Sequence, residues 1–545
     1  MTRLAQRIFT ITDLGAFSAA SSDWNPWHVD HIRARRTQAG APVVHGIHLL
    51  LWALESLADS LPDLPAFHGL QVHFNKFVFL DESVELLLVK QTSSSARMHI
   101  LVDNGLRLRV NVEFGDRFQS SAPSIDPAVK PQPLLSVPLE LRFQEIDGRS
   151  GSFPFPMCED DAVSMFPAAA KWMVVVRVRA LAASTYLVGM VCPGLHSIYS
   201  DLSVNACDVD RTQNVLAFRV TETDPRFNAV EQEILGGGIS GVVRSFLRQP
   251  PLRQASMNAL KSVVAPGEFS GAVVLVVGGS RGLGELTAKL IATGGGRVIL
   301  TWQSGKEDAE HVANEIRSVG GVCDTVEYDV RTPAARQLTA LPAIPTHMYY
   351  FATCTIFRPQ GEFFSIGRLR EFLAFYVDGF WQLLHGLRAM QPGISAFYPS
   401  SISVTKRPRG MTEYSMAKAA GEVLCADMNE TLAPLYITVR RLPRLPTDQT
   451  AAVTEPAIET AKDRPRRLNP IKQKQMEDRC AFLEEEIPRI EAAIAHTEEQ
   501  LGVYVSASET ERLSKLADDL RGQLESLTTE WESLTMQLDE QAALP

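Results

Sequence analysis

Residues 272–285 read AVVLVVGGSRGLGE, and this stretch decides the fold of the third quarter of the chain. Residues 272–277 form an uninterrupted apolar run, which is typical of a β-strand buried on both faces. Glycines at a turn from strand to helix let the backbone approach a pyrophosphate, which the free N–H groups of the helix then bind. The stretch therefore predicts a nucleotide site, although a tight structural turn alone is the plainer alternative. The predicted contacts are Gly278, Ser280, Arg281, Gly282, Leu283 and Gly284.

The rest of the chain divides into blocks on either side of this turn. A chain of 545 residues is too long for one core, because domains usually have about 100–200 residues. Alternating strand and helix patterns extend over 268–450 and predict βαβ units with a parallel sheet. A Pro- and Ser-rich segment at 121–133 and a charged joint at 454–470 separate further blocks. We expect four domains, at 1–120, 135–262, 268–450 and 470–540.

Composition excludes several classes of protein. The net charge of -10 argues against binding to nucleic acid or to an anionic membrane through bulk charge. The most apolar window, near 173–191, contains Arg177 and Arg179, so no membrane span is expected. The seven cysteines form no CxxC pair, which predicts reduced thiols in a cytoplasmic protein and no metal site.

A second group of reactive side chains follows in SSISVTKRPRGMTEYSMAKAAGE, residues 400–422. Tyr414 and Lys418 are four residues apart, which places both side chains on one face of a helix. A nearby ammonium group favours tyrosinate and makes the phenol a better acid toward a carbonyl oxygen. The Ser401 hydroxyl can hold that carbonyl group. A surface Tyr and Lys on a solvated helix is the alternative for this spacing alone.

Together, the glycine turn and these three side chains resemble the short-chain dehydrogenase/reductase family, especially its 3-oxoacyl-thioester reductases. The resemblance covers about residues 268–450 and implies a Rossmann-type sheet with a nicotinamide cofactor. It implies that Tyr414 is the acid, that Lys418 binds the ribose and lowers the pKa of the tyrosine, and that Ser401 orients the substrate. Asp329 and Val330 match the family's Asp-Val position near the adenine.

The second strand of this block predicts NADPH as the cofactor. Its sequence RVILTWQSGKED, residues 297–308, has no acidic residue at the strand end to bind a ribose 2′-hydroxyl. Arg281 and Lys306 are available for a 2′-phosphate.

Three features depart from the family pattern. Phe351, Ala352 and Thr353 stand where the family has Asn-Asn-Ala-Gly, and Tyr376 takes the place of an assisting Asn. The later Pro-Gly turn reads Pro443-Arg444. Beyond it, the helix that covers the substrate and the last strand of the family are not recognisable.

The first block contains FSAASSDWNPWHVDHIRARRTQAGAPVVHGIHLLLWALESL, residues 17–57. Asp23 and His28 flank an Asn-Pro turn, and Gly46 begins an apolar helical run. A carboxyl group beside a neutral imidazole can move the protons of a hydration, and an N–H at a helix start can stabilise a thioester enolate. A capped turn with a structural His28 is the alternative.

This pattern resembles the MaoC-like, hot-dog-fold (R)-specific enoyl-thioester hydratases over about residues 8–115. The resemblance implies that Asp23 and His28 are the catalytic pair and that Gly46 supplies the oxyanion N–H. His45 and His48 are expected to pack or hydrogen-bond locally. Residues 135–262 contain LVGMVCPGLHSIYSDLSVNAC but no D-x-N-P-x-H, which indicates a degenerate second hot-dog unit that completes a double hot-dog.

The last block predicts two helices in an antiparallel hairpin. Apolar residues recur at heptad spacing from Met476 to Leu501 and again from Leu513 to Leu538, and Pro488 is expected to kink the first helix. The hairpin resembles the C-terminal coiled coil of ABC-F ATPases, but no Walker A motif is present, so no ATPase activity carries over. Oligomerisation or docking of a synthase or acyl carrier is the expected role.

The sequence therefore predicts a multidomain α+β and α/β enzyme acting on acyl-CoA or acyl carrier protein thioesters. It would reduce a 3-oxoacyl thioester with NADPH and dehydrate the product to the trans-2-enoyl thioester, in fatty-acid or polyketide-type biosynthesis. Consecutive steps give the fusion a rationale, because the intermediate need not diffuse far. Two alternatives stay open, a chain with one active domain and a scaffold of degenerate domains that presents the coiled coil.

Overall fold

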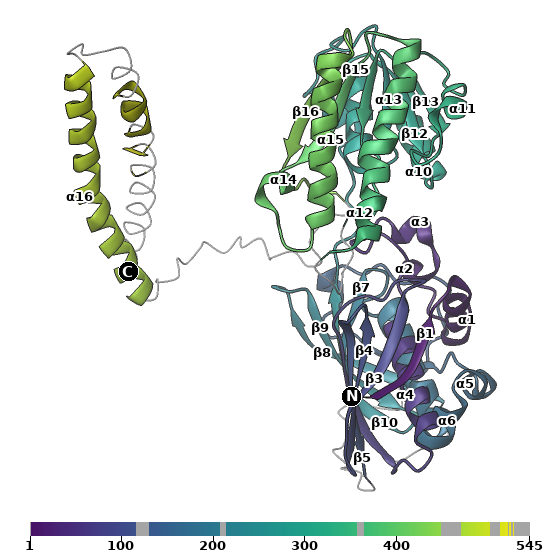
Figure 1. Ribbon diagram of the computed structural model, residues 1–545. Coiled ribbons are helices and arrows are strands. Elements are labelled where there is room, and N and C mark those ends of the chain that lie inside the picture. The colour runs from purple at the N-terminus through teal and green to yellow at the C-terminus, as the bar shows by residue number, and fades with distance from the viewer. Residues whose placement is uncertain are drawn as a thin grey trace. The chain divides into compact units, whose positions relative to one another are not determined.

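The computed structural model describes residues 2–115, 130–207, 214–356, 364–447 and 470–501, and a few short stretches between 513 and 527. The chain forms two compact units, Met1–Ala457 and Ile458–Pro545. The first unit contains a ten-stranded antiparallel sheet and a six-stranded parallel sheet (Figure 1). The predicted combination of an α+β block with a parallel α/β block is thereby confirmed.

The ten-stranded sheet has the order β1-β3-β4-β5-β2-β7-β10-β9-β8-β6. If the second half is read from its outer edge, the order becomes β6-β8-β9-β10-β7, which repeats the first half strand for strand. The two halves are joined where β2 pairs with β7, with Leu70 opposite Val204. The strands are β1 Thr2–Ile8, β2 Phe67–Phe74, β3 Ser83–Gln91, β4 Ser95–Val102, β5 Gly105–Phe114, β6 Ser150–Pro154, β7 Ser197–Ala206, β8 Val215–Asp224, β9 Ala229–Gly236 and β10 Ile239–Leu247.

Each half wraps its sheet around one long apolar helix. These helices are α4, Gly46–Ser60, and α7, Val175–Tyr186, which continues as a π-helix over Leu187–Val191. Both helices contribute to one continuous core with the inward side chains of the sheet. Shorter elements are α1 Ile11–Ser21, α2 Pro26–Val29, α3 His31–Ala34, α5 Glu159–Met165, α6 Pro167–Met173 and the 3₁₀ turn Phe143–Glu145.

The window that the sequence analysis found most apolar is part of this core. In the part of the chain that the structure describes, no single helix has the length and apolar character to cross a membrane. Among the described residues, one bent pair of helices, Pro167–Met173 and Val175–Val191, is long and apolar enough when taken together, with a bend of 112° between them. Arg177 and Arg179 are buried there and donate to the backbone oxygens of Gly238 and Met157.

The parallel sheet has the order β13-β12-β11-β14-β15-β16. Alternate residues of β11 serve two cores: Leu275 and Val277 join one, and Val274 and Val276 join the other. This explains the uninterrupted apolar run, because helices cover both faces of the sheet. The strands are β11 Val273–Val277, β12 Arg297–Trp302, β13 Cys323–Glu327, β14 His347–Tyr350, β15 Ser395–Ser401 and β16 Tyr436–Leu442.

Helices α12, α13 and α15 lie along one face of this sheet, and α9 and α10 pack on the other (Figure 1). The helices are α8 Met257–Leu260, α9 Gly282–Thr293, α10 Lys306–Ser318, α11 Ala334–Leu338, α12 Ile366–Leu373, α13 Gly379–Met390, α14 Ser403–Lys406 and α15 Thr412–Thr431, with a π-helix over Ala374–Asp378 between α12 and α13. The substrate-covering segment that was not recognisable in the sequence falls after Thr447, and Asp448 and the residues to 469 lie outside the described residues.

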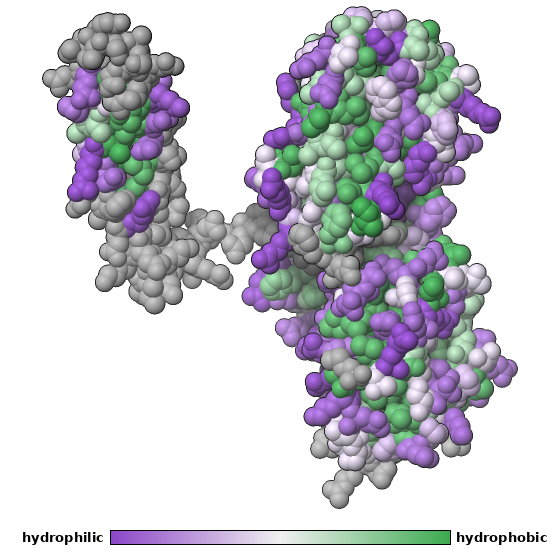
Figure 2. All heavy atoms as spheres, viewed as in Figure 1, coloured by the Kyte–Doolittle hydropathy of each residue, from purple (hydrophilic) through white to green (hydrophobic). Residues whose placement is uncertain are grey.

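The second unit contains α16, Pro470–Leu501, which includes the predicted Pro488. Leu483 and Thr497 are buried on its apolar side, and Leu513 and Ala517 of the next described helical stretch are buried as well. Figure 2 shows an apolar strip bordered by hydrophilic residues on this unit. Much of the predicted second helix lies outside the described residues, so the antiparallel hairpin stays a prediction.

The seam between the two hot-dog halves provides a test of the double fold. We expect Leu202→Ala to lower the free energy of unfolding by about 2–5 kcal/mol, because it leaves a cavity opposite Val72 in the shared core. Ser203→Ala, at the exposed neighbouring position, should change it by less than about 0.5 kcal/mol. Urea unfolding followed by tryptophan fluorescence measures both. Equal stability of the two variants would mean that the seam is not a packed core.

Candidate functional site

The glycine turn after β11 leaves no room for side chains. Gly278 has φ +74°, and a Cβ there would lie 2.9 Å from the Ala352 backbone nitrogen. A Cβ on Gly284 would collide with the Gly278 carbonyl oxygen, and Gly282, with φ +58°, begins α9. The backbone can therefore approach a ligand closely at the start of a helix, as a bound pyrophosphate requires. The turn fits the phosphate part of a nicotinamide cofactor.

A cleft of about 710 Å³ begins at this turn. Every residue predicted to bind the cofactor lines it, and so does every residue predicted to carry the reduction. They are Gly278, Ser280, Arg281, Gly282, Leu283, Gly284, Asp329, Val330, Ser401, Tyr414 and Lys418. Lys306, the other residue proposed for a 2′-phosphate, is exposed and is not among the lining residues. One cavity thus connects the nucleotide turn with the reactive side chains.

Asp329 follows β13 at the adenine end of the cleft. Both of its carboxylate oxygens accept from Arg331, Oδ1 from Nε at 3.0 Å and Oδ2 from Nη2 at 2.7 Å. These hydrogen bonds lower the pKa of Asp329 and keep it ionised, although burial opposes the effect. The carboxylate is therefore an acceptor fixed in place.

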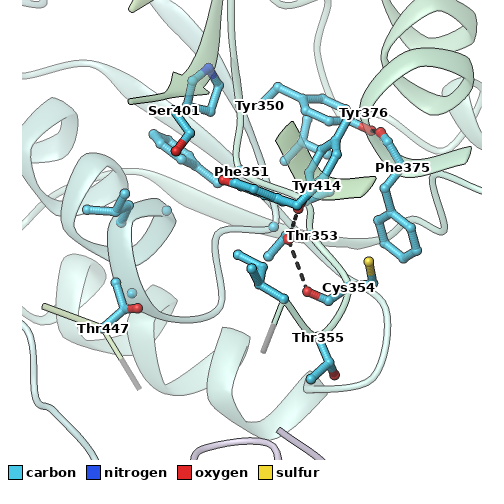
Figure 3. Close-up of a pocket in the computed structure, with 18 of the residues that line it drawn as sticks. Tyr350, Phe351, Thr353, Cys354, Thr355, Phe375, Tyr376, Ser401, Tyr414 and Thr447 are labelled. Carbon is cyan, nitrogen blue, oxygen red and sulfur yellow. Dashed lines mark hydrogen bonds between the residues drawn. The ribbon is translucent and has the colours of Figure 1, made fainter. Parts of the chain in front are cut away.

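Tyr414 and Ser401 meet at the opposite end of the cleft, from α15 and the end of β15 (Figure 3). Both side chains line the same cleft. Burial raises the pKa of Tyr414, and the neighbouring Ser401 hydroxyl offsets only part of that rise. The phenol therefore keeps its proton at neutral pH, as a proton donor to a carbonyl oxygen must.

Lys418 lies one helical turn beyond Tyr414 and is buried. Its Nζ donates to the Pro399 carbonyl oxygen at 2.7 Å and lies 3.9 Å from the centre of the Tyr376 ring. Burial lowers the pKa of Lys418 to about 7. The ammonium is therefore held by one carbonyl and a cation–π contact, and the charge of Glu422 offsets only part of the effect of burial.

Tyr376 occupies the helix position where the sequence analysis noted a missing Asn. It lies in the π-helix, a local widening that is frequent at functional sites. Its hydroxyl is 2.5 Å from Thr353 Oγ1, and its carbonyl accepts from the Tyr398 hydroxyl at 3.1 Å. Figure 3 shows Thr353 between Tyr376 and Cys354 on one wall of the cleft. Two of the three departures from the family pattern thus contact each other, a pairing that the sequence did not indicate.

The second predicted site lies in the antiparallel half, where Asp23 follows α1. Its carboxylate is buried and accepts from the Asn25 backbone N–H at 3.2 Å and from the Thr185 hydroxyl at 2.7 Å. Burial raises the pKa of Asp23, although the charge of His28 and these hydrogen bonds oppose the rise.

His28 is fixed by its own backbone contact. Its Nδ1 lies 2.7 Å from the Val43 carbonyl oxygen, so Nδ1 donates and the lone pair of Nε2 stays free. Burial lowers the pKa of His28, while Asp23 opposes the effect, so the imidazole is neutral at neutral pH. A neutral imidazole with a free Nε2 can act as a base.

His45 and His48 pack as predicted, although His45 also adjoins the pair. Its ring stacks on His28 at 3.7 Å and an interplanar angle of 24°, and the His48 ring stacks on Phe17 at 4.4 Å. The ligand atoms of Asp23, His28 and His45 lie within 4.8 Å of one another.

The second hot-dog half closes this site, which sequence reasoning missed. Gly189, in the π-helix, makes room for Asp23, because a Cβ there would collide with the carboxylate. Asn25 Nδ2 donates to the Gly189 carbonyl at 3.0 Å. The second half thus contributes Thr185 and Gly189 to this site. Both lie more than 150 residues after Asp23 in the sequence, Thr185 by 162, and no local motif marks them. Only the repeated topology could have indicated them.

Gly46 is the first residue of α4 and follows its N-cap His45, whose ring stacks on His28. The first N–H groups of a helix have no intrahelical acceptor. A Cβ on Gly46 would lie 2.6 Å from Phe74 Cε1, so a larger residue would have to displace that ring. The Gly46 N–H is therefore a donor at a helix start that an oxyanion can use.

Comparisons with known proteins match two parts of the chain. A family described as MaoC like domain matches residues 4–111, and a family described as short chain dehydrogenase matches residues 272–345. Neither matched region includes the C-terminal unit, so the resemblance of the tail to ABC-F coiled coils stays a prediction.

Curated relatives match the reductase region. A cyclic-di-GMP-binding biofilm dispersal mediator protein of Escherichia coli is 24% identical over 186 residues, 34% of this chain and 77% of the relative. A 3-oxoacyl-[acyl-carrier-protein] reductase of Aggregatibacter actinomycetemcomitans is 28% identical over 167 residues, 27% of this chain. An uncharacterized oxidoreductase of Caenorhabditis elegans is 42% identical over 77 residues, 14% of this chain. The chain spans 64% of the Aggregatibacter protein and 24% of the Caenorhabditis protein.

Two solved structures are also similar. A FolM alternative dihydrofolate reductase 1 from Brucella suis in complex with NADP is 19% identical, with a TM-score of 0.30 over 32% of this chain and 74% of the other. A 3-oxoacyl (acyl-carrier-protein) reductase from Agrobacterium tumefaciens with NADP bound is 20% identical, with a TM-score of 0.31 over 33% of this chain and 73% of the other. From the family matches, the chain carries a MaoC-like domain and a short-chain dehydrogenase domain, the combination of a dehydratase–reductase fusion.

Proposed function

We propose that this chain is a bifunctional enzyme of acyl-thioester biosynthesis. It reduces a 3-oxoacyl thioester to the 3-hydroxyacyl thioester with NADPH and dehydrates that product to the trans-2-enoyl thioester. The observation that carries the proposal is the single cleft that contains the glycine turn together with Tyr414 and Ser401. The 3-oxoacyl reductase among the relatives supports the substrate class.

In the reductase, the nicotinamide cofactor supplies the hydride when it is bound. Ser401 donates a hydrogen bond to the substrate carbonyl and holds it beside Tyr414. Tyr414, protonated because burial raises its pKa, gives its proton to the oxygen as negative charge develops there. Lys418 lies one helical turn from Tyr414, on the same face of the helix. Its positive charge there stabilises the resulting tyrosinate.

The choice of NADPH rests on the end of β12. Gln303 and Ser304 line the cleft there and neither is acidic. Asp308, near the start of α10, is paired with Arg35 and Arg36 and is not free to accept from a ribose 2′-hydroxyl. A ribose 2′-hydroxyl would find no acidic acceptor here, whereas a 2′-phosphate would meet guanidinium groups. Both features favour NADPH over NADH.

In the dehydratase, His28 Nε2 takes the α-proton of the 3-hydroxyacyl thioester, and the Gly46 N–H stabilises the enolate-like oxygen. Asp23, whose pKa burial raises, donates a proton to the departing hydroxyl group, which leaves as water. After this step His28 has gained one proton and Asp23 has lost one. Transfer of one proton from His28 to Asp23 returns the pair to its starting state.

A second candidate is an enzyme in which only the dehydratase half is active. The contact of Lys418 with Pro399 and Tyr376 favours it, because a lysine engaged there is less available to a ribose. A homo-oligomer, or docking of a synthase through the C-terminal unit, is proposed for either case. Whether the thioester is carried by coenzyme A or by acyl carrier protein is decided by comparing the products of both substrates by mass spectrometry.

The central variants separate the two reactions. Tyr414→Phe should lower NADPH oxidation with a 3-oxoacyl thioester by about 10²–10⁴-fold and leave hydration of a trans-2-enoyl thioester intact. Asp23→Asn should do the reverse. Tyr349→Phe, on the neighbouring strand but outside the cleft, is the matched control. Wild-type oxidation of NADPH without any enoyl product would exclude the dehydratase half, and enoyl hydration without NADPH oxidation would establish the second candidate instead.

The buried lysine predicts an unusual pH profile. Lys418 is charged below its pKa of about 7 and neutral above it, because burial disfavours the ammonium. If the ammonium supports the reaction, kcat/KM for NADPH should be high below pH 7 and fall as the pH rises through about 7. Initial rates between pH 5.5 and 9.5 test this. A profile that stays flat to pH 9 would mean that Lys418 keeps its proton or is not needed.

The contact between the two hot-dog halves predicts a positioning role for Thr185. Thr185→Val keeps the shape but removes the hydrogen bond to Asp23, so hydration should fall by about tenfold or more. The part of the pH–rate profile that is set by the ionisation of Asp23 should also shift to higher pH, because this hydrogen bond lowers the pKa of Asp23. Thr185→Ser should retain both the rate and the profile. A Thr185→Val enzyme with reduced rate but an unshifted profile would indicate a packing role only.

A further inference from the structure

The cofactor cleft has one lining residue that belongs to neither the glycine turn nor the reductase region. This residue is Arg35, the C-cap of α3 in the MaoC-like domain. It lines the cleft together with Arg281 and with Gln303 and Ser304 of the loop after β12. In a Rossmann-type fold this loop recognises the 2′ substituent of the adenine ribose.

Arg35 is held in place by contacts with the reductase domain. Its guanidinium pairs with Asp308, near the start of α10, and its carbonyl oxygen accepts from the Arg281 guanidinium. Gly305, the N-cap of α10, makes room for it, because a Cβ there would collide with the Arg35 guanidinium. The side chain is therefore largely buried, with 14% of its surface exposed, and its orientation is fixed.

Arg35 shares its acidic partner with a second arginine. Asp308 pairs with two guanidinium groups, since Arg36 Nη2 also lies 2.8 Å from its Oδ1. Burial raises the pKa of Asp308, but the two arginines outweigh it and keep the carboxylate ionised. Arg35 thus lies in a cationic group that also contains Arg281, which donates to its carbonyl oxygen. Such a group attracts a 2′-phosphate, which carries about −1.5 to −2 charges at neutral pH.

Arg35 also has a hydrogen-bond donor left over. Its Nε is buried and has no partner among the described residues. A buried guanidinium N–H without an acceptor is costly, so a ligand oxygen that reached this Nε would satisfy it. Phosphate oxygens are the acceptors that guanidinium groups bind best, often through two N–H groups at once.

We propose that Arg35 of the MaoC-like domain completes the cofactor site of the reductase domain by binding the 2′-phosphate of NADPH. This inference rests on the proposed NADPH dependence and deepens it: the dehydratase half supplies the cofactor specificity of the reductase half. It also gives the fusion a second physical rationale, because the reductase domain lacks this contact when it is alone.

Binding measurements test the proposal without turnover. The affinities of NADPH, NADH, 2′,5′-ADP and 5′-AMP are measured by calorimetry for the full chain. Arg35→Ala should weaken NADPH and 2′,5′-ADP by about 10- to 100-fold and leave NADH and 5′-AMP within about twofold. Arg36→Ala is the matched control, because Arg36 pairs with the same carboxylate but is not among the residues lining the cleft. It should keep all four affinities within about threefold.

The outcomes separate this proposal from the proposed function. Equal losses for NADPH and NADH in Arg35→Ala, or the same losses in Arg36→Ala, would make Arg35 a structural link between the domains and overturn the proposal. Unchanged NADPH affinity would overturn it as well. If the wild-type protein binds NADH as tightly as NADPH, this proposal and the NADPH preference are overturned, but the proposed reductase activity is not. If it binds neither nucleotide, the proposed reductase activity is overturned as well. If Arg35→Ala unfolds, Arg35→Gln, which keeps the length of the side chain, should give the same selective loss.

Discussion

The hydrogen bond from Thr185 to the buried carboxylate of Asp23 joins the two halves of the antiparallel sheet at the dehydratase site. A buried carboxylate is costly unless it is hydrogen-bonded, and here one of its partners comes from the other repeat. The π-helix that continues α7 places Gly189 against Asp23, and the Gly189 carbonyl oxygen accepts from Asn25. The second repeat lacks the catalytic motif of its own, yet the site in the first repeat is not complete without it. The two repeats therefore share one site, and β2 pairs with β7 at the seam between them.

The reductase site follows a different principle, in which aromatic rings replace polar groups. Lys418 lies among the rings of Tyr376, Tyr398 and Tyr414, and the charge of Glu422 offsets only part of the effect of its burial. Tyr376 and Thr353, which belong to two of the departures from the family pattern, form one hydrogen-bonded pair on the cleft wall. The site therefore keeps the serine, tyrosine and lysine of the family but surrounds them with a drier environment. Such an environment keeps Tyr414 protonated and makes the charge of Lys418 sensitive to pH near neutrality.

Local sequence patterns were sufficient for the elements whose chemistry is local. The run 272–277 predicted a strand buried on both faces, and the spacing of Tyr414 and Lys418 predicted that they share one helix face. The structure has both features, because hydrophobic periodicity and helical spacing depend only on residues that are close in sequence. The motif around Asp23 and His28 likewise identified one pair. Thr185 and Arg35 could not be found in this way. Each acts on a residue of another repeat or domain, so only the three-dimensional arrangement reveals its partner. Lys306 was proposed from sequence proximity alone, and it lies outside the lining of the cleft while Arg35 lies inside it.

The central claim is that one polypeptide passes its substrate through both reactions. The most direct measurement uses NADPH carrying deuterium at the transferred position and a 3-oxoacyl thioester, with products resolved by mass spectrometry over time. The account predicts a 3-hydroxyacyl thioester with one deuterium at C3, followed by a trans-2-enoyl thioester that retains this deuterium, because dehydration removes the hydroxyl from C3 and a proton from C2. A labelled hydroxyacyl product that accumulates without any labelled enoyl thioester would contradict the account.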